Sequence, residues 1–464
     1  MVRLTLIAGL LLVIGGCKTV DPNFCGLHQD DSRCPIDGPP TGGEKCTMSS
    51  QCPSSGFPVC DTSGLEGKCV ACTPADAHLC VDATPVCTKN QCAACTKHTD
   101  CPESLACLPS GACAKSTDVA YVDGDRNVDS VNCTKVDPCK SIAKALGKKM
   151  IVKVFGTVQE RPDLNNRMGM ILADPNTVLR PMTGDNGTVL AVRGNSSDLQ
   201  IYDLQISNGT GGNAGIGISL ADSAKLSLTR VSVITNSDRG IAVTGMNSSL
   251  TCTQCSLLNN GAQGLEATTG NVTITQSKIA NNSGGGVHFT ASAGFHIIGN
   301  FIYQNGQAGL TAASGVNVAV NMQAGGAPAN ELNFNSITGN FGADLGQGIQ
   351  CVSGTQLTTS NNIVWSNGVN PVTDMQVFGT KCSFTYSDIG PIPDVGTMNI
   401  MDNPQFAAAG DLHLMPTSPA QGGGDPAVNL TGLTENDIDG EPRAKRTGKG
   451  PDIGADQYYP PAGQ

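Results

Sequence analysis

Apolar and polar residues alternate in short runs along the middle of the chain, and these runs recur at a regular interval. Segments 236–240, 260–264, 282–286 and 305–309 each run from an Asn to a Gly at one spacing, and segment 208–215 has three extra residues. The Gly positions recur every 22 to 25 residues. A repeat of this length is typical of a solenoid. The Asn positions are Asn208, Asn236, Asn260, Asn282 and Asn305.

Alignment of the repeats on these Asn residues gives three pairs of apolar columns, with one mostly polar or small residue inside each pair. This is strand alternation, with one side chain inside and the next outside. Each repeat therefore holds three short strands. After the Gly, the predicted inward columns are Ile216, Ile241, Leu265, Val287 and Leu310, then Ile218, Val243, Ala267, Phe289 and Ala312.

Three strands in each coil predict an all-β fold, a right-handed parallel β-helix over residues 150–400. Equivalent strands of neighbouring coils would stack about 4.8 Å apart. We expect the Asn column to be structural, because Asn tolerates tight turns and stacked amides can bond from rung to rung. The Gly would supply a turn conformation that a Cβ hinders.

Cysteine is concentrated before this region. Of 21 Cys, 12 lie in residues 46–113, where large apolar residues are few. A segment of this kind needs covalent staples and predicts a small disulfide-rich stalk. Two CxxC pairs also match zinc-ribbon spacing, so zinc is an alternative there. The three groups are Cys46/52/60/69, Cys72/80/87/92 and Cys95/101/107/113; the CxxC pairs are Cys69/Cys72 and Cys92/Cys95; further candidate pairs are Cys25/Cys34, Cys133/Cys139, Cys252/Cys255 and Cys351/Cys382.

The N-terminus has the pattern of an export signal. Arg3 precedes an apolar run over residues 4–14, which is too short to span a membrane as a permanent helix. The run ends in Val-Ile-Gly-Gly-Cys17, which resembles a bacterial lipobox. The resemblance implies a lipoprotein signal peptide over 1–16, a lipid anchor on Cys17 and a tether over 17–45. Lys18 after the Cys favours the outer membrane.

Overall charge narrows the choice of partners. The formal net charge is −11 and no basic patch stands out, so nucleic acid is not expected as a partner. Membrane contact would come through the lipid, and a polysaccharide or cell-surface glycan is a possible ligand.

Both ends of the solenoid need caps, because open strand edges invite aggregation. Tyr121-Val-Asp123, an amphipathic segment 138–146 and a strand 151–156 predict an N-terminal cap over 114–149. Here the chain resembles bacterial β-helix proteins of the pectate-lyase-like superfamily. The C-terminal cap, 401–464, is similar to choice-of-anchor-type terminal regions, through Asp437-Ile-Asp-Gly440, Arg443 and Asp452-Ile-Gly-Ala455. The superfamily includes lyases, hydrolases, epimerases and non-enzymes, so the resemblance predicts architecture rather than activity.

Residues suited to catalysis or metal binding are sparse in the predicted outward columns. Glu266 and His288 are stacked ionisable neighbours that can do acid–base work, although such pairs are more often surface contacts. No cofactor is expected, but calcium is possible. Its candidate ligands are Asp123, Asp125 and Asp129, in a sequence that begins like a calcium loop, and Asp437, Asp439 and Asp452. The outward columns are Gln200, Ser227, Thr251, Thr273 and His296; Gln205, Ser232, Ser256, Lys278 and Phe301; and Gly217, Ala242, Glu266, His288 and Thr311.

Two functional hypotheses follow. The first is an exported, surface-anchored outer-membrane lipoprotein whose β-helix is a structural, adhesive or glycan-binding module. The alternative is a polysaccharide lyase or glycoside hydrolase with a site in the less regular coils beyond Ala312. The nearly uncharged outward columns favour the first.

Overall fold

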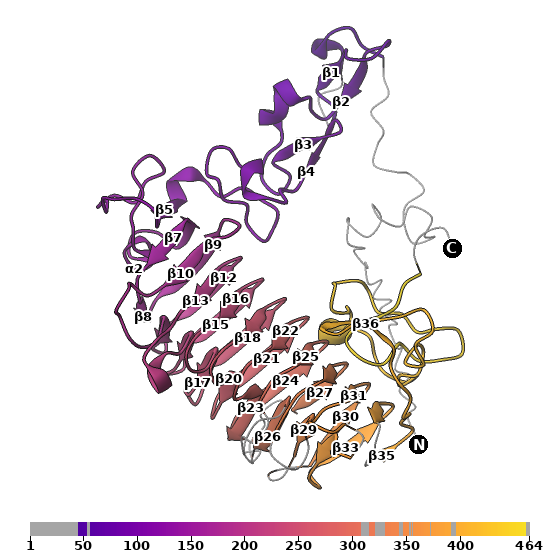
Figure 1. Cartoon of the computed structure of the whole chain (residues 1–464). Coiled ribbons are helices and arrows are strands. Elements are labelled where there is room, and N and C mark those ends of the chain that lie inside the picture. Colours follow the sequence, from indigo (N-terminus) through magenta and orange to yellow (C-terminus); the bar gives the residue numbers. More distant parts are fainter. Residues whose placement is uncertain are drawn as a thin grey trace, which may run out of the picture. The chain divides into compact units, whose positions relative to one another are not determined.

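The computed structural model describes residues 45–52, 56–307, 315–320, 330–342, 347–351, 354, 356–371, 373–390 and 396–460 (Figure 1). The described chain forms two compact units. The smaller contains the described residues up to Cys101 together with Cys107–Cys113, and the larger contains Pro102–Ala106 and the described residues from Ala114 onward. Within these residues, no helix is long and apolar enough to cross a membrane. The predicted signal peptide, the tether, Cys17, Cys25, Cys34, Leu310, Thr311 and Ala312 lie outside the described residues.

The larger unit is a parallel β-helix with three long sheets, named here in the order in which each coil visits them. The first sheet has 12 described strands, the second 10 and the third 9, and in each sheet the neighbours come from successive coils. The first consists of β5 (Val119–Asp123), β6 (Ile151–Phe155), β9 (Met168–Ala173), β12 (Asp198–Tyr202), β15 (Lys225–Thr229), β18 (Ser249–Thr253), β21 (Asn271–Thr275), β24 (Gly294–Ile298), β27 (Glu331–Asn333), β30 (Leu357–Ser360), β33 (Cys382–Thr385) and β35 (Gly396–Thr397).

The second and third sheets complete each coil. The second consists of β7 (Thr157–Gln159), β10 (Val178–Arg180), β13 (Gln205–Ser207), β16 (Ser232–Ile234), β19 (Ser256–Leu258), β22 (Lys278–Ala280), β25 (Phe301–Tyr303), β28 (Ser336–Thr338), β31 (Ile363–Trp365) and β34 (Asp388–Gly390). The third consists of β8 (Asp163–Asn165), β11 (Leu190–Arg193), β14 (Ile218–Leu220), β17 (Ile241–Val243), β20 (Gln263–Ala267), β23 (Gly285–Ala291), β26 (Val316–Val320), β29 (Ile349–Gln350) and β32 (Val377–Phe378).

Apolar columns fill the interior as predicted. In β18, Leu250 and Cys252 are buried, whereas the intervening Thr251 is half-exposed. The register corrects the third-sheet columns at both ends of the repeat array. Ile218, and not Ile216, pairs with Ile241, because the turn between Gly209 and Ile218 is longer than the turn between Asn236 and Ile241 and contains the short helix η5 (Gly212–Ala214). At the other end, Val316 pairs with Val287 in the place assigned to Leu310.

Buried asparagines form a ladder along the corner between the second and third sheets. Asn260 Nδ2 donates to Asn282 Oδ1 (2.8 Å), and the same oxygen accepts from the Asn260 backbone amide (3.1 Å). This bonding repeats along Asn236, Asn260, Asn282, Asn305, Asn340 and Asn367, and the last rung is Gln376. Four of the five predicted Asn positions, Asn236, Asn260, Asn282 and Asn305, therefore lie in this ladder.

Asn208 was predicted to belong to this ladder, and that prediction is wrong. The ladder position in its coil is Gly209, whose amide donates to Asn236 Oδ1 (2.9 Å). Asn208 is exposed and has φ 62°, the left-handed conformation that Thr235 (φ 53°) and Asn259 (φ 57°) adopt one residue before the ladder. The alignment slipped by one residue because Asn is favoured both in the turn and in the ladder.

The glycine column lies at the same corner because a side chain would not fit there. A Cβ on Gly264 would lie 2.8 Å from Asn282 Nδ2 and 2.9 Å from the Gly286 carbonyl oxygen. Gly240 has similar neighbours, and neither residue has a positive φ. These glycines therefore leave room for the next Asn amide, rather than supplying the turn conformation expected from the sequence. This close approach explains why Asn and Gly recur together.

A second polar ladder replaces an apolar column further along the helix. The column begins with Leu204 and Val231 and becomes polar from Ser277 onward. Asn300 Nδ2 donates to Asn335 Oδ1 (3.0 Å), and Asn335 Nδ2 donates to Asn362 Oδ1 (3.0 Å). This ladder lies at the turn between the first and second sheets, so two corners of the later coils are held by amides.

The N-terminal coil is covered by the predicted amphipathic helix, α2 (Ile142–Leu146). Ile142, Ala145 and Leu146 are buried, and the Ser141 hydroxyl accepts from the Lys144 amide at the start of the helix. η4 (Ser116–Asp118) precedes β5. Glu160 is also close to this helix start, since its carboxylate accepts the Ile142 amide (2.5 Å).

The C-terminal segment, with β36 (Phe406–Ala408), β37 (Asp411–Leu414) and η6 (Gly432–Thr434), lies against the outer face of the second sheet (Figure 1). Leu412, Ile438 and Ala455 pack with Phe301 of β25. Leu414, Ala420 and Ile453 pack with Ile363 of β31. Apolar side chains on the outside of these strands, unusual for a face open to water, are thereby buried.

The smaller unit repeats one disulfide-bonded structure three times, and the disulfide prediction is confirmed. In each group the first Cys bonds to the third and the second to the fourth. Cys69, Cys72, Cys92 and Cys95, the four cysteines of the zinc alternative, are all disulfide-bonded. The elements are η1 (Ser49–Gln51), β1 (Val59–Asp61), β2 (Lys68–Val70), η2 (Pro74–Leu79), β3 (Val86–Thr88), β4 (Gln91–Ala93) and η3 (His98–Asp100).

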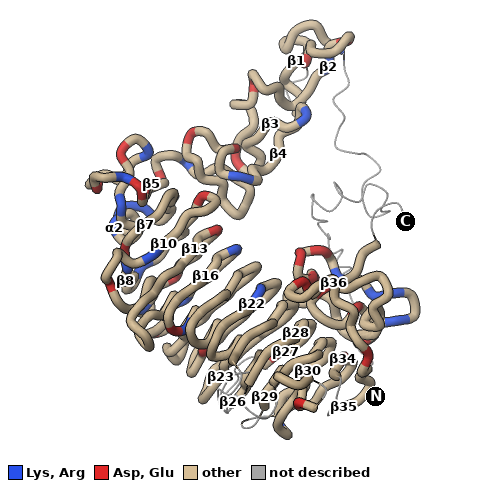
Figure 2. Tube along the Cα trace, in the orientation of Figure 1, with Lys and Arg blue, Asp and Glu red and all other residues tan. Residues whose placement is uncertain are grey.

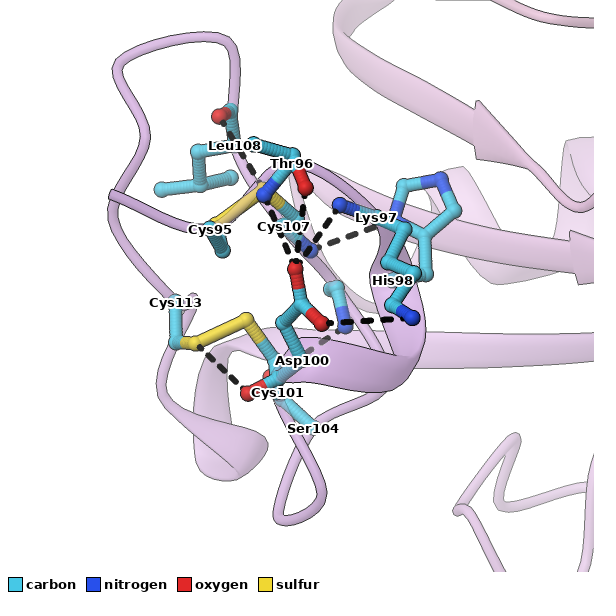
Figure 3. The surroundings of a disulfide bond; sticks show 11 residues. Cys95, Thr96, Lys97, His98, Asp100, Cys101, Ser104, Cys107, Leu108 and Cys113 are labelled. Carbon is cyan, nitrogen blue, oxygen red and sulfur yellow. Dashed lines mark hydrogen bonds and ion pairs between the residues drawn. A yellow bond between two sulfur atoms is a disulfide. The ribbon is translucent and has the colours of Figure 1, made fainter. Parts of the chain in front are cut away.

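Figure 3 shows the third of these repeats, where a carboxylate organises the turn between two cysteines. Asp100 Oδ2 accepts from the backbone amides of Thr96 (3.0 Å) and Lys97 (3.1 Å). In the first repeat, Gln51 Oε1 accepts from the amides of Thr47 and Met48 in the same way. A side-chain acceptor just before the second Cys thus replaces a hydrophobic core as the local organiser.

In the larger unit, the predicted pairs Cys133–Cys139, Cys252–Cys255 and Cys351–Cys382 are also bonded.

Candidate functional site

The outward row of the third sheet holds the predicted pair Glu266 and His288, which are register partners on β20 and β23. The row differs from prediction at both ends. Ser219, and not Gly217, pairs with Ala242, and Asn317 follows His288 where Thr311 was expected. Both corrections follow from the insertions described above.

Glu266 is held mainly by Arg239, a residue in the Asn-to-Gly turn. Arg239 Nη1 lies 2.5 Å from Glu266 Oε2, and the same guanidinium contacts Asp238. His288 Nδ1 is 3.6 Å from Glu266 Oε1, is buried and has no hydrogen-bond partner among the described residues. Burial lowers the pKa of His288, against the opposing effect of Glu266. Burial thus favours the neutral imidazole of His288, and the Glu266 carboxylate is shared with the Arg239 guanidinium.

The outer face of the first sheet carries a continuous polar row. Register pairing stacks Gln200, Ser227, Thr251, Thr273, His296 and Glu331, all half-exposed. Two residues further along each strand lies a second row, with Tyr202, Thr229, Thr253 and Thr275. We call the half-exposed Ser227, Thr229, Thr251, Thr253 and Thr273 the hydroxyl face; Thr275 continues the second row but is buried, and its hydroxyl is hydrogen-bonded to that of Thr253. Side chains on adjacent rungs repeat about every 4.8 Å, which gives an ordered grid of uncharged donors and acceptors.

His296 and Glu331 form an acid–base pair at one end of this face. His296 Nδ1 lies 3.2 Å from Glu331 Oε2, and Asn333 Nδ2 donates to Glu331 Oε1 (2.6 Å). The hydrogen bond from His296 is the largest influence on Glu331 and lowers the pKa of its carboxyl group, against the effect of burial.

Sequence reasoning missed this pair because the repeat interval lengthens after Asn300. Asn300 and its ladder partner Asn335 are 35 residues apart. The signal was present, however. The spacing of Leu332, Asn335 and Ile337 repeats that of Ile297, Asn300 and Ile302, and this alignment places Glu331 beside His296.

Charge is unevenly distributed over the larger unit. Figure 2 shows that the middle rungs are mostly uncharged and that coloured positions gather around α2 and in the C-terminal segment. The hydroxyl face lies on these middle rungs, with the exposed Lys225 at the start of β15 and the Arg230–Asp203 ion pair beyond its end.

The predicted calcium ligands near the N-terminal cap have structural partners. Asp123 Oδ1 accepts from the Asp125 amide, and Asp125 Oδ1 accepts from the Thr157 amide. Asp129 bonds Lys144 Nζ (2.7 Å) and the Lys140 amide. The arrangement is that of a turn tied to the first coils.

The C-terminal aspartates separate into two kinds. Asp437 accepts three backbone amides, and Asp452 is bonded to Arg446 through both carboxylate oxygens. These two carboxylates hold the segment together. Asp439 instead is exposed and approaches His413 and Asp456, which sequence reasoning did not select.

Comparison with known proteins agrees with this fold. The model of the right-handed β-helix region matches residues 182–302 and 247–388. A family of unknown function (DUF8331) matches residues 34–119, which span the disulfide-rich repeats. Together with the register, the first match confirms the predicted β-helix.

Two solved structures extend the comparison. Pectate lyase Pel9A aligns at 13% identity with a TM-score of 0.49, covering 74% of this chain and 96% of that chain. The A-module of the mannuronan C-5 epimerase AlgE6 from Azotobacter vinelandii aligns at 15% identity with a TM-score of 0.24, covering 65% of this chain and 88% of that chain. A comparison with curated proteins finds no match. At these identities the likeness concerns the fold, and the site must be argued from this chain's own residues.

Proposed function

We propose that the β-helix binds an extended, uncharged glycan along the hydroxyl face. The supporting observation is the stacked row of Ser and Thr hydroxyls on β15, β18 and β21. Hydroxyl groups donate and accept, as sugar hydroxyls do, and water can bridge them. The face offers few charges that would select an acidic polymer. Tyr202, half-exposed beside Gln200, adds an aromatic surface at one end.

Binding to immobilised neutral and acidic polysaccharides tests this proposal. The double variant Thr251→Val, Thr273→Val removes two hydroxyls with little change in shape, and we expect about tenfold weaker binding, since each lost hydrogen bond contributes roughly 0.5–1.5 kcal/mol. The matched control is Ser232→Ala, Ser256→Ala, whose hydroxyls lie outward on the second sheet. Equal losses in both variants, or preference for acidic polymers, would contradict the proposal.

A second candidate function rests on the His296–Glu331 pair. A carboxylate hydrogen-bonded to a His can support general acid–base cleavage of a glycosidic linkage. This is the lyase or hydrolase alternative, whose site was predicted in the coils beyond Ala312; Glu331 lies in that region, and His296 lies before it on the first sheet. Assays for unsaturated products and new reducing ends, with and without calcium, would detect it. Activity that disappears in Glu331→Gln but survives in Glu266→Gln would establish this alternative; intact glycans after prolonged incubation would exclude it.

We further propose that the protein is exported and anchored to the outer membrane at the cell surface by lipid on Cys17. The supporting observations are the lipobox-like sequence and the disulfide-bonded repeats, which are typical of an oxidising compartment. Metabolic labelling with a radioactive fatty acid should mark the wild-type protein and not Cys17→Ala. External protease should remove the anchored protein from intact cells; protection until the cells are broken would place it on the inner side.

A further inference from the structure

We infer that His413, Asp439 and Asp456 bind one divalent transition-metal ion that fastens the C-terminal segment to itself. Each residue offers one ligand atom, and these atoms all lie within 4.8 Å of one another. The residues come from β37 and from two loops more than a dozen residues away from it and from each other. The inference does not depend on the glycan-binding proposal, since the cluster is built by a different part of the chain.

The core beneath the cluster brings these segments together. Leu412, Ile438 and Ala455 are buried against Phe301, and each immediately precedes one of the three ligand residues. The ring of His413 also stands edge-on to Phe301, with 5.2 Å between ring centroids. The apolar contacts therefore fix the three backbones independently of any ion. The ligand set is preorganised, which reduces the entropy lost on binding.

The surroundings of His413 match those of a metal-ligating histidine. Its Nδ1 contacts Asp411 Oδ1, and its Nε2 lies 2.9 Å from Asp439 Oδ2. A carboxylate on one ring nitrogen fixes the tautomer and orients the other nitrogen toward the ion. Two carboxylates therefore contact the imidazole, and the ligand oxygen of Asp456 lies within 4.8 Å of the ligand atoms of His413 and Asp439.

Asp456 is the buried ligand. It is 5% exposed, and its Oδ2 accepts from the Leu414 amide (2.7 Å). A buried carboxylate is costly unless a cation compensates its charge. An ion held between Asp456 and the other two ligands would supply that compensation.

The donor set favours zinc over calcium. Zinc accepts His and Asp together and can keep solvent as a fourth ligand, whereas calcium takes six to eight oxygens. At metal–ligand distances of about 2.1 Å, tetrahedral ligand atoms lie roughly 3.4 Å apart, so small side-chain movements would close the present arrangement. The alternative without a metal ion is a protonated His413 held between Asp411 and Asp439.

The test uses the full, oxidised chain in detergent after treatment with EDTA. Zn²⁺, Mn²⁺ and Ca²⁺ are titrated separately by calorimetry, and the retained metal is counted by elemental analysis. We expect one equivalent of Zn²⁺ and slower hydrogen exchange around β37 on binding. Asp439→Asn should weaken Zn²⁺ binding more than about 100-fold, and Asp411→Asn about 10–100-fold, the usual range for an outer-shell partner.

Glu441→Gln is the matched control, because it removes one exposed acidic charge beside the cluster and no ligand. Its Zn²⁺ affinity should stay within about threefold of wild type. Circular dichroism on each variant separates a lost ligand from a lost fold. The absence of one-equivalent binding would leave only the imidazolium bridge, equal losses in Glu441→Gln and Asp439→Asn would mean a diffuse acidic surface, and preference for Ca²⁺ would contradict the metal class. Each of these results overturns the inference.

Discussion

The disulfide-rich unit and the β-helix are both built from repeats, but their repeats are stabilised by different interactions. The first repeats short segments with few large apolar residues, and each repeat is closed by two covalent bonds of its own. The second repeats a coil whose apolar columns and asparagine ladder are completed only by its neighbours. Stability is therefore local in one unit and shared between adjacent repeats in the other. A perturbation should stay within one repeat of the first unit but spread along the coils of the second.

Reduction of the disulfides should give the largest difference between the two units. Each bond contributes about 2–4 kcal/mol, and the small unit has little else to hold it. With a reductant we expect rapid proteolysis and hydrogen exchange in residues 56–113, while the strands from β9 to β25 stay protected. Alkylating reagent without reductant is the control. Equal loss of protection in both units would show that the β-helix also depends on its disulfides.

Loss of one ladder amide should be nearly as damaging, but within the β-helix. Asn282→Ala removes bonds to Asn305 Oδ1 and the Leu257 carbonyl, and leaves the Asn260 amide unpaired. Unsatisfied buried groups cost about 1–3 kcal/mol each, so we expect roughly 3–6 kcal/mol in the free energy of unfolding.

Asn208→Gly is the control for the ladder variant, since this exposed turn residue keeps its left-handed conformation as Gly. It should change stability by less than about 1 kcal/mol. Chemical denaturation followed by circular dichroism measures both variants. Similar losses at the two positions would remove the distinction between turn and ladder.

The sequence was informative wherever the interval between repeats stayed constant. Between Asn236 and Asn305, the alignment gave the correct inward columns and ladder, because a strand has two faces and a shifted register would bury polar side chains. Errors at Asn208, Gly217 and Leu310 arose where insertions changed the interval. Alternation says nothing about how long a turn is.

Contacts between segments distant in sequence were the other limit. The Cys spacing predicted disulfides but left their pairing open, because spacing does not determine which cysteines meet. His413 and Asp456 have no spacing signal either, since apolar residues packed on Phe301 bring them together. Glu331 could have been identified from the sequence as the partner of His296, because its coil repeats the spacing of the ladder residues.

The two units should also respond oppositely to pH. Burial raises the pKa of Asp388 in β34 to about 8, partly opposed by a backbone hydrogen bond from Asp402. The folded state then holds a proton that the unfolded state loses near pH 4, so this contribution to stability falls as pH rises from about 4 to 8. The Thr96 amide bond, partly opposed by burial, lowers the pKa of Asp100, so its contribution is present above pH 4 and is lost on acidification.

Hydrogen exchange between about pH 3 and pH 9, corrected for intrinsic rates, measures this difference. The last coils should become less protected at high pH, and Asp388→Asn should abolish that trend, with a gain on the order of a few kcal/mol at pH 8. Asp100→Asn should destabilise only the third disulfide repeat at neutral pH, and its difference from wild type should vanish when the pH falls below about 4. A pH response of the last coils that persists in Asp388→Asn would assign it to another group.

Gly264→Ala should have the smallest effect of this series, and it separates space from backbone freedom as the reason for the glycine column. The added methyl group would meet Asn282 Nδ2 and the Gly286 carbonyl, so we expect a loss of about 1–3 kcal/mol from overpacking. Gly64→Ala in the disulfide-rich unit is the control, because its nearest neighbour is 3.7 Å away; it should stay within about 0.5 kcal/mol. Thermal unfolding of each unit, followed by exchange, measures both. If Gly264→Ala leaves the free energy of unfolding unchanged, the corner can accommodate a methyl group. The asparagine ladder would then not require the close contact between each Gly and the next Asn amide.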